Sequence, residues 1–173
     1  GTSPGFRKVH LRVSQETPVY SVEFNSFDAP ASAAEWLDTG LLQITEIDSI
    51  EGLDYRIHKQ DQLWLSDDLQ AAEPNAARDL ITGLENLRVT TVVDIATASI
   101  LADTPAPPSL VVEAARKRYE YHLYEIENAR YLKRDDVAVF FSISQLDYDR
   151  LSNAGREQLF PTQEPTPEEK SEQ

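Results

Sequence analysis

The three histidines are the residues best suited to metal binding or acid–base chemistry, and their spacing argues against a local site. His10, His58 and His122 each fall inside a segment that we expect to be a strand, and none has a second histidine two or four residues away. A local zinc clamp needs such closely spaced ligands. We therefore predict exposed or hydrogen-bonded histidines on sheet faces. The alternative is that the fold brings all three histidines together to form a metal site.

Two acidic pairs, Asp67-Asp68 and Asp135-Asp136, are the next candidates, because carboxylates bind cations and also shape turns. A calcium loop needs further oxygen ligands at alternate positions and usually a glycine, and neither pair has them. Short carboxylates hydrogen-bond the turning backbone, so we predict turns at both pairs. With 30 acidic residues in the chain, a carboxylate pair for glycoside hydrolysis stays open, but no two residues are singled out.

The motifs of nucleophilic and phosphate chemistry are missing from the sequence. It contains no G-x-S-x-G elbow and no Ser-x-x-Lys, and its six glycines form no phosphate-cradling loop. Trp36 and Trp64 could stack on a sugar, but packing is the simpler role for them. We therefore predict no catalytic, cofactor-binding or metal-binding residue and no cofactor.

The C-terminal part of the chain has the clearest alternation of apolar and polar residues. Residues 117–126 predict a strand, with a bulge where the apolar phase changes near Tyr124, and Val137 to Ile143 alternate again. Turns are expected at Asn128-Ala129 and at Asp135-Asp136, which gives a three-stranded antiparallel meander. From Ser144 a capping box predicts a short helix that ends at Gly155.

The N-terminal part predicts hairpins and helices in alternation. Lone prolines, glycines and polar turns separate the segments. Tyr55 and Ile57 are expected to face Leu63 and Leu65 across the second hairpin. The expected elements are a hairpin of 8–13 and 19–24, a helix at 31–38 capped by Ser32, an extended segment at 41–50, a hairpin of 53–59 and 63–65, a helix at 75–87 and a strand at 89–95.

These patterns predict an α+β protein of antiparallel β-meanders with short flanking helices, arranged as two lobes. Prolines at 105, 107 and 108 break the periodicity of residues 96–108, which we take as the boundary. The predicted organisation is an N-terminal α+β lobe over 1–100, a C-terminal lobe of meander and helix over 109–160, and a disordered acidic tail over 161–173.

Charge and composition limit the partners that the chain can bind. The net charge is −14, and the tail accounts for only three of these charges, so the rest of the chain is itself acidic. Such a surface repels phosphate backbones and anionic headgroups, which argues against nucleic acid and against direct lipid binding. The mean hydropathy of −0.45 predicts no membrane span within the sequence. The chain has no cysteine, so the sequence does not indicate whether its compartment is oxidising or reducing.

Several of these segments carry a resemblance to a known family. The order Ile47-x-x-Ile50, Tyr55 to Lys59, Leu63-Trp64-Leu65 and an amphipathic helix is similar to a bacterial domain family of unknown function. The segment from Arg130 to Asp136, followed by Val139 to Ile143, resembles its C-terminal part. Members are typically single-pass, membrane-anchored extracytoplasmic proteins encoded beside gliding-motility-type ABC transporters. No catalytic residue is carried over, because none is established for the family.

The resemblance implies a non-catalytic extracytoplasmic accessory or interaction domain on the periplasmic side. It also implies an ABC transporter component as membrane partner and an inner-membrane anchor upstream of Gly1. Tyr119, Tyr121 and Phe140 are the candidate partner contacts, with burial under flanking helices as the competing interpretation. The alternative function is a periplasmic hydrolase or ligand-binding protein with an acidic cleft between the lobes.

Overall fold

The computed structural model describes residues 8–14, 17–23, 33–104 and 106–161. Contacts divide the chain into two compact units, Gly1–Leu37 and Asp38–Gln173, instead of at the predicted boundary near residues 96–108. Strand β3 (Ile47–Glu51) precedes that segment and pairs with β7 (Leu110–Ala114), which follows it, so the sheet is continuous across the predicted boundary. Of the predicted tail 161–173, residues 162–173 lie outside the described residues.

The first unit contains the predicted N-terminal hairpin. Strands β1 (Lys8–Leu11) and β2 (Tyr20–Glu23) pair antiparallel, with His10 opposite Ser21. A short 3-10 helix, η2 (Ala33–Trp36), lies within the helix predicted over 31–38. The predicted cap Ser32 lies outside the described residues.

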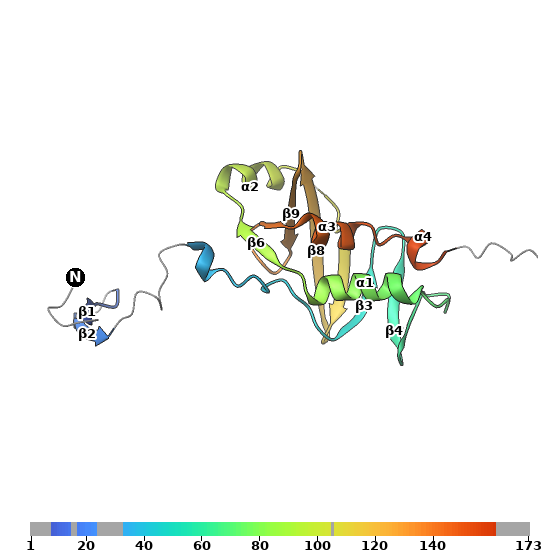
Figure 1. Cartoon of the computed structure of the whole chain (residues 1–173), viewed down its shortest axis with the longest axis horizontal. Coiled ribbons are helices and arrows are strands. Elements are labelled where there is room, and N and C mark those ends of the chain that lie inside the picture. Colours follow the sequence, from blue (N-terminus) through green and yellow to red (C-terminus); the bar gives the residue numbers. More distant parts are fainter. Residues whose placement is uncertain (1–7, 15–16, 24–32, 105, 162–173) are drawn as a thin grey trace, which may run out of the picture. The chain divides into compact units, whose positions relative to one another are not determined.

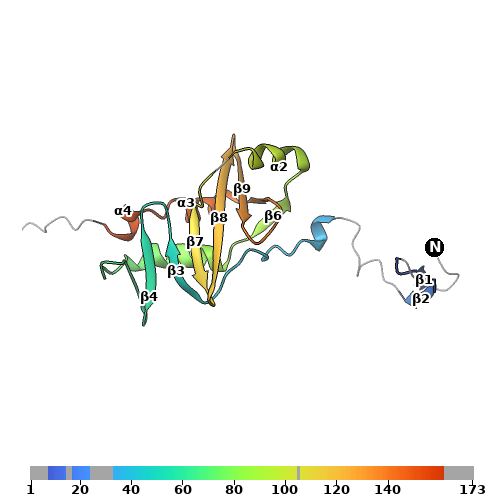
Figure 2. The ribbon, with the colours of Figure 1, turned by 180° about the vertical axis from the view of Figure 1, so that it is seen from behind.

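The second unit is built on one eight-stranded antiparallel sheet, with strand order β5-β4-β3-β7-β8-β9-β10-β6 (Figures 1 and 2). Most neighbouring strands are joined by short turns, as expected for meanders. The remaining strands are β4 (Arg56–Gln60), β5 (Leu63–Leu65), β6 (Val89–Val92), β8 (Lys117–Ile126), β9 (Ala129–Arg134) and β10 (Phe141–Ile143).

Three helices lie on one face of this sheet. Helix α1 (Pro74–Glu85) contacts both α3 (Gln145–Ser152) and α4 (Arg156–Leu159), and strands lie in front of α1 when the unit is seen from behind (Figure 2). Helix α2 (Ile95–Ala102) instead follows β6 at the end of the sheet (Figure 1). No helix of the described ranges is long and apolar enough to cross a membrane. The α+β prediction is confirmed.

The core lies between the sheet and helix α1. Helix α1 forms as predicted: Pro74 occupies its first turn, the Glu73 carboxylate accepts a hydrogen bond from Ala76 N, and an apolar stripe recurs at helical spacing. On the strands, Ile50 pairs with Ile57 and with Val112, which puts these side chains on the helix-covered face. The fully buried side chains include Leu42, Ile50, Ile57, Leu80, Leu84, Leu87, Leu110, Tyr121, Leu132, Phe141 and Leu151.

Helix α2 was missed in the sequence, where Ile95 was assigned to the strand predicted over 89–95 and residues 96–102 to the boundary segment. Asp94 caps the helix, since its carboxylate accepts hydrogen bonds from Ala96 N at 3.0 Å and Thr97 N at 3.1 Å. Almost every residue of α2 is small or apolar, so no polar face produces a helical period.

The second hairpin has a register different from the one predicted. A turn at Asp61-Gln62, with φ of 56° at Asp61, brings Gln60 opposite Leu63 and Lys59 opposite Trp64. Trp64 therefore shares a face with Ile57, while Leu63 and Leu65 point to the other side. The prediction that Tyr55 and Ile57 face Leu63 and Leu65 was wrong, because the turn is one residue shorter than assumed.

The meander and its helix differ from expectation at their ends. The pairing of β8 with β9 runs without a bulge from Tyr121 to Ile126. Strand β10 begins only at Phe141, because the turn after Asp135 continues with a hydrogen bond from Val137 N to Arg134 O at 3.0 Å. The Ser144 cap of α3 is confirmed by the hydrogen bond from Asp147 N to Ser144 Oγ at 3.0 Å. The helix ends at Ser152, and Gly155 instead precedes α4.

Candidate functional site

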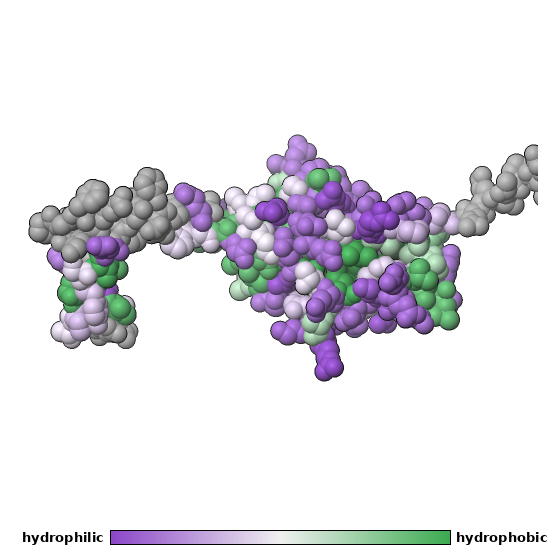
Figure 3. Space-filling view, turned by 60° about the horizontal axis from the view of Figure 1, so that its bottom comes forward, coloured by the Kyte–Doolittle hydropathy of each residue, from purple (hydrophilic) through white to green (hydrophobic). Residues whose placement is uncertain are grey.

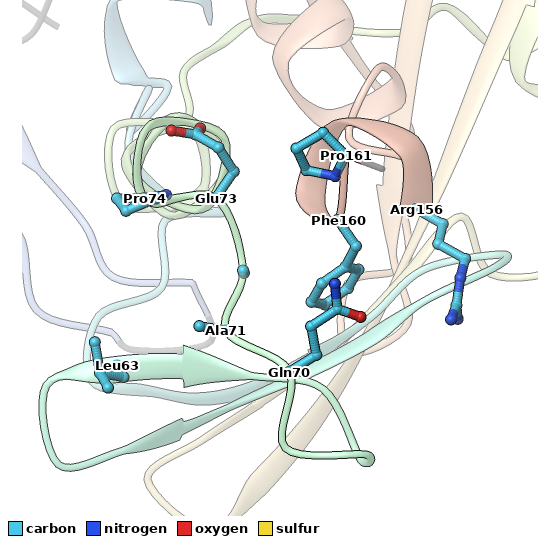
Figure 4. Close-up of a pocket in the computed structure, with 9 residues that line it drawn as sticks. Leu63, Gln70, Ala71, Glu73, Pro74, Arg156, Phe160 and Pro161 are labelled. Atoms are coloured by element: carbon cyan, nitrogen blue, oxygen red, sulfur yellow. The ribbon is translucent and has the colours of Figure 1, made fainter. Parts of the chain in front are cut away.

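The second unit has a groove on its surface, which is the candidate site. It consists of two adjoining cavities of about 740 and 350 Å³, which share Leu63, Ala72 and Pro74. The larger cavity lies between the start of α1, the segment before it and α4 (Figure 4). The smaller one is lined by residues of β5 and α1, including Trp64, Ala77 and Ile81. We call the two cavities together the groove.

The floor of the groove is made by the chain that folds back beside β5. Ser66 N donates to Gln70 O at 2.9 Å and Ala72 N donates to Trp64 O at 2.8 Å, so residues 70–72 run along the edge of β5. Leu69, with φ of 61°, lies in the reversal between them. This places Gln70 and Ala71 at the base of the larger cavity (Figure 4).

Helix α4 supplies the opposite wall. Arg156 N donates to Asp54 Oδ1 at 3.2 Å, and Glu73 N donates to Leu159 O at 2.8 Å, which joins the end of α4 to the start of α1. The ring of Phe160 extends from this wall and the side chain of Gln70 from the floor, toward each other (Figure 4). The wall is therefore held at one end by a hydrogen bond to the Asp54 carboxylate and at the other by a backbone–backbone hydrogen bond.

The groove combines apolar side chains with two guanidinium groups. Leu63 is 59% exposed, and Trp64 is half-buried beside it. The Arg156 guanidinium lies 6.0 Å from the centre of the Phe160 ring. Neither Arg156 nor Arg78 takes part in an ion pair among the described residues. Figure 3 shows hydrophobic residues gathered at the end of this unit that carries the groove.

The carboxylate of Glu73 lines the larger cavity but serves helix α1. It accepts hydrogen bonds from Ala76 N at 2.7 Å and from Asn75 Nδ2 at 3.1 Å, and it points toward the helix (Figure 4). These bonds, with the backbone bond to Ala76 as the largest cause, lower the pKa of Glu73. Glu73 therefore stays ionised near neutral pH, whereas a general acid needs a raised pKa.

We expect Glu73→Ala to destabilise the protein at neutral pH, with a loss that shrinks in acid. The folded-state pKa of Glu73 lies below its usual value of 4.5, so the cap contributes stability above that value. The contribution is lost as the pH falls through the folded-state pKa, because the carboxyl is then protonated in both states. Urea midpoints of wild type and variant, from pH 7 to about pH 2, measure this. A difference that stays constant across the range would contradict it.

The structure places the predicted partner contacts largely in the interior. Tyr121 is fully buried, and its hydroxyl donates to Leu42 O at 2.8 Å. Burial raises the pKa of Tyr121 to about 12. Phe140 is also buried, edge-to-face against Tyr124 at 5.7 Å. Tyr119 is half-buried under the Arg134 guanidinium, 5.0 Å from its ring centre. Tyr121 and Phe140 are therefore buried within the second unit, whereas Tyr119 is only half-buried.

The histidines of the sheet are not brought together. His58 on β4 and His122 on β8 are separated by β3 and β7, and three strand spacings amount to about 14 Å. His122 Nδ1 lies 3.1 Å from Ala106 O, so it is hydrogen-bonded as predicted. His10 is exposed on β1 in the first unit. Within the described ranges, no group of three or more histidines and acids could hold a metal ion.

Both acidic pairs lie in turns, as predicted. Asp67 and Asp68 are exposed in the reversal after β5. Asp135 Oδ1 accepts a hydrogen bond from Glu120 N at 3.0 Å, and Asp136 binds the buried Arg134 guanidinium through two oxygens. These carboxylates therefore hold the backbone and a buried cation in place.

Comparison with known proteins identifies the family. A family model described as "Domain of unknown function (DUF4340)" matches residues 1–107, which is more than half of the chain. The chain belongs to this family. No curated protein and no solved structure matches it.

The DUF4340 match covers one wall of the groove and not the other. It includes β5, the segment 70–72 and helix α1, whereas Arg156 and Phe160 of α4 follow the matched residues. The C-terminal part of the predicted resemblance, from Arg130 onward, also lies beyond them. The groove therefore combines the DUF4340 segment with the end of the chain.

Sequence reasoning missed the α4 wall of this DUF4340 protein. Residues 156–160 followed the expected helix stop at Gly155 and were given no role. The signal that could have found them is the adjacent pair Leu159-Phe160, both buried, after a glycine that begins a helical turn. Local patterns do not indicate that this turn lines the same cavity as Gln70, because that arrangement is tertiary.

Proposed function

We propose that this chain is a non-catalytic extracytoplasmic accessory domain that binds a protein partner and serves an ABC-type transporter. The resemblance described above supports the proposal, because such proteins are typically membrane-anchored and encoded beside gliding-motility-type transporters. In this proposal a segment upstream of Gly1 tethers the domain to the inner membrane, on the periplasmic side. The partner is a membrane protein of the transporter system.

The groove is the observation that carries the proposal. Protein interfaces are enriched in aromatic residues and arginine, and their central contacts are apolar side chains that leave water. The groove offers Trp64, Phe160, Arg78 and Arg156 around the exposed Leu63. A protein segment that fills this surface would bury Leu63 and pair with the two guanidinium groups.

A ligand-binding protein is the second candidate, because the larger cavity of about 740 Å³ has the size of a small-molecule site. Arg156 would then bind an anionic group of the ligand. The hydrolase version is less well supported, since the carboxylate of this cavity, Glu73, caps α1 and has a lowered pKa. The larger cavity lies within one compact unit, but residues of both predicted lobes line it, and Glu73 is the one acidic residue among its described lining residues, so it is not the acidic cleft of that alternative.

Purification of the full-length protein from solubilised membranes distinguishes these functions. The accessory function predicts that a membrane protein partner is recovered with it in fixed proportion. It also predicts a purified domain without stoichiometric metal and without saturable hydrolysis. Recovery of the protein alone, together with tight binding of a small anion that is lost in Arg156→Ala, would favour the ligand-binding function instead.

A further inference from the structure

Helix α2 is apolar on nearly all sides, yet the unit leaves most of it exposed. Of its residues only Leu101 is fully buried. Ile95 is 87% exposed, Ile100 is 57% exposed, and Val92 in the preceding strand is 52% exposed. Short helices without a polar face are normally buried inside a protein. We call Val92, Ile95 and Ile100 together with the small exposed residues of α2 the α2 surface.

The exposed arc of α2 is continuous around the helix. At about 100° per residue, Ile95, Ala96, Ser99, Ile100 and Ala102 fall on the side opposite Leu101, and all five are exposed. An arc of this kind is wide enough to contact a second helix or a loop along the whole length of α2.

The hydroxyl groups of α2 do not make this surface polar. Ser99 Oγ donates to Ile95 O at 2.9 Å, and Thr97 Oγ1 donates to Asp94 Oδ2 at 2.7 Å. Just beyond the helix, Thr104 Oγ1 donates to Ile100 O at 2.9 Å. Each hydroxyl is thus hydrogen-bonded within the helix or its cap, and the arc presents mainly carbon atoms to water.

Charged groups border the α2 surface at both ends of the helix. Asp94 at the N-cap and Asp103 at the C-cap are exposed. The pKa of Asp94 is lowered by hydrogen bonds from Thr97, of which the bond from the Thr97 side chain has the largest effect. A second copy of this chain would bring the same aspartates together, and an anionic lipid surface would repel them. A partner with basic residues around an apolar centre complements both the centre and the border.

We propose that the α2 surface is a second docking site, which binds an apolar segment of a partner protein that is bordered by lysine or arginine. The apolar residues of the partner cover Ile95 and Ile100, and its cations pair with Asp94 and Asp103. This surface is separate from the groove, whose lining contains no residue of α2. The two proposals can therefore fail independently.

A titration of the full chain with two synthetic helical peptides tests the proposal, one built from leucine and lysine and the other from leucine and glutamate. At 19.5 kDa the protein is suited to amide NMR. The lysine peptide is expected to shift the amide signals of residues 95–102 and to bind more weakly as salt rises, whereas the glutamate peptide does not bind. Equal binding of both peptides would overturn the proposal.

Substitutions on the α2 surface complete the test. The double change Ile95→Ser and Ile100→Ser is expected to weaken binding of the lysine peptide about tenfold or more, and Asp103→Asn by a smaller factor. Leu146→Ser, which changes an exposed leucine of α3, is the control and leaves binding unchanged. Unchanged affinity in the double variant would contradict the proposal. The proposal would also be contradicted if the wild-type protein associated with itself, or bound phosphatidylglycerol vesicles, and the double variant did not. The occupant of the α2 surface would then be a second copy of the chain or lipid.

Discussion

Replacing Tyr121 with alanine is expected to lower the free energy of unfolding by about 3 to 5 kcal/mol, as large aromatic truncations in cores do. The side chain has no exposed surface, and the Arg134 guanidinium lies 5.9 Å from its ring centre. Its hydroxyl also holds the Leu42 carbonyl at 2.8 Å. Urea denaturation measures the change.

The matched control is Tyr121→Phe, which keeps the ring and removes only the hydroxyl. We expect it to cost about 1 kcal/mol, the usual worth of one hydrogen bond. A partner contact, the role first predicted for Tyr121, would instead be accessible, and its truncation would leave the denaturation midpoint unchanged. An unchanged denaturation midpoint in Tyr121→Ala would therefore indicate that Tyr121 lies on the surface, which would contradict the packing described above.

Replacing Gly52 with alanine is expected to cost about 3 kcal/mol, the upper end of the usual cost of overpacking. Gly52 N donates to Tyr55 O at 2.9 Å, and this turn brings the tyrosine ring against the glycine. A Cβ at position 52 would lie 2.5 Å from Tyr55 Cζ, well inside van der Waals contact. Tyr55 is buried, so its ring has little room to move aside.

A second substitution shows whether the clash is the cause. In a Tyr55→Leu background the ring is gone, so the added cost of Gly52→Ala is expected to fall to a small fraction of its value in the wild type. A double-mutant cycle measures this coupling. If the cost of Gly52→Ala were the same in both backgrounds, it would come from the backbone of the turn and not from the ring.

The elements that the sequence predicted well are those with a local period. Ala77, Leu80 and Leu84 recur at helical spacing after Pro74, and this stripe alone indicates α1 and its buried face. Ser144 and Asp147 likewise indicate the start of α3. These features depend on neighbours within a few residues, so they can be predicted without knowledge of the fold.

The features that were missed depend on single residues or on distant contacts. Alternation along β8 shows that Tyr121 shares a face with Tyr119, but it does not show which face the helices cover. The left-handed Asp61 shortens one turn and thereby sets the position of Trp64. Gln70 and Phe160 line the same cavity although they are far apart in the sequence, and no local pattern indicates this arrangement.

The most direct test of the central claim compares Leu63→Asp with Leu146→Asp in the full-length protein. Both leucines are 59% exposed, but Leu63 lines both cavities of the groove and Leu146 lines neither. Each variant is purified from solubilised membranes, and the amount of co-purified partner is measured relative to wild type. A groove that binds the partner predicts a loss of about tenfold or more in Leu63→Asp, and wild-type recovery in Leu146→Asp. Wild-type recovery in Leu63→Asp, with the folded state intact, would contradict the account.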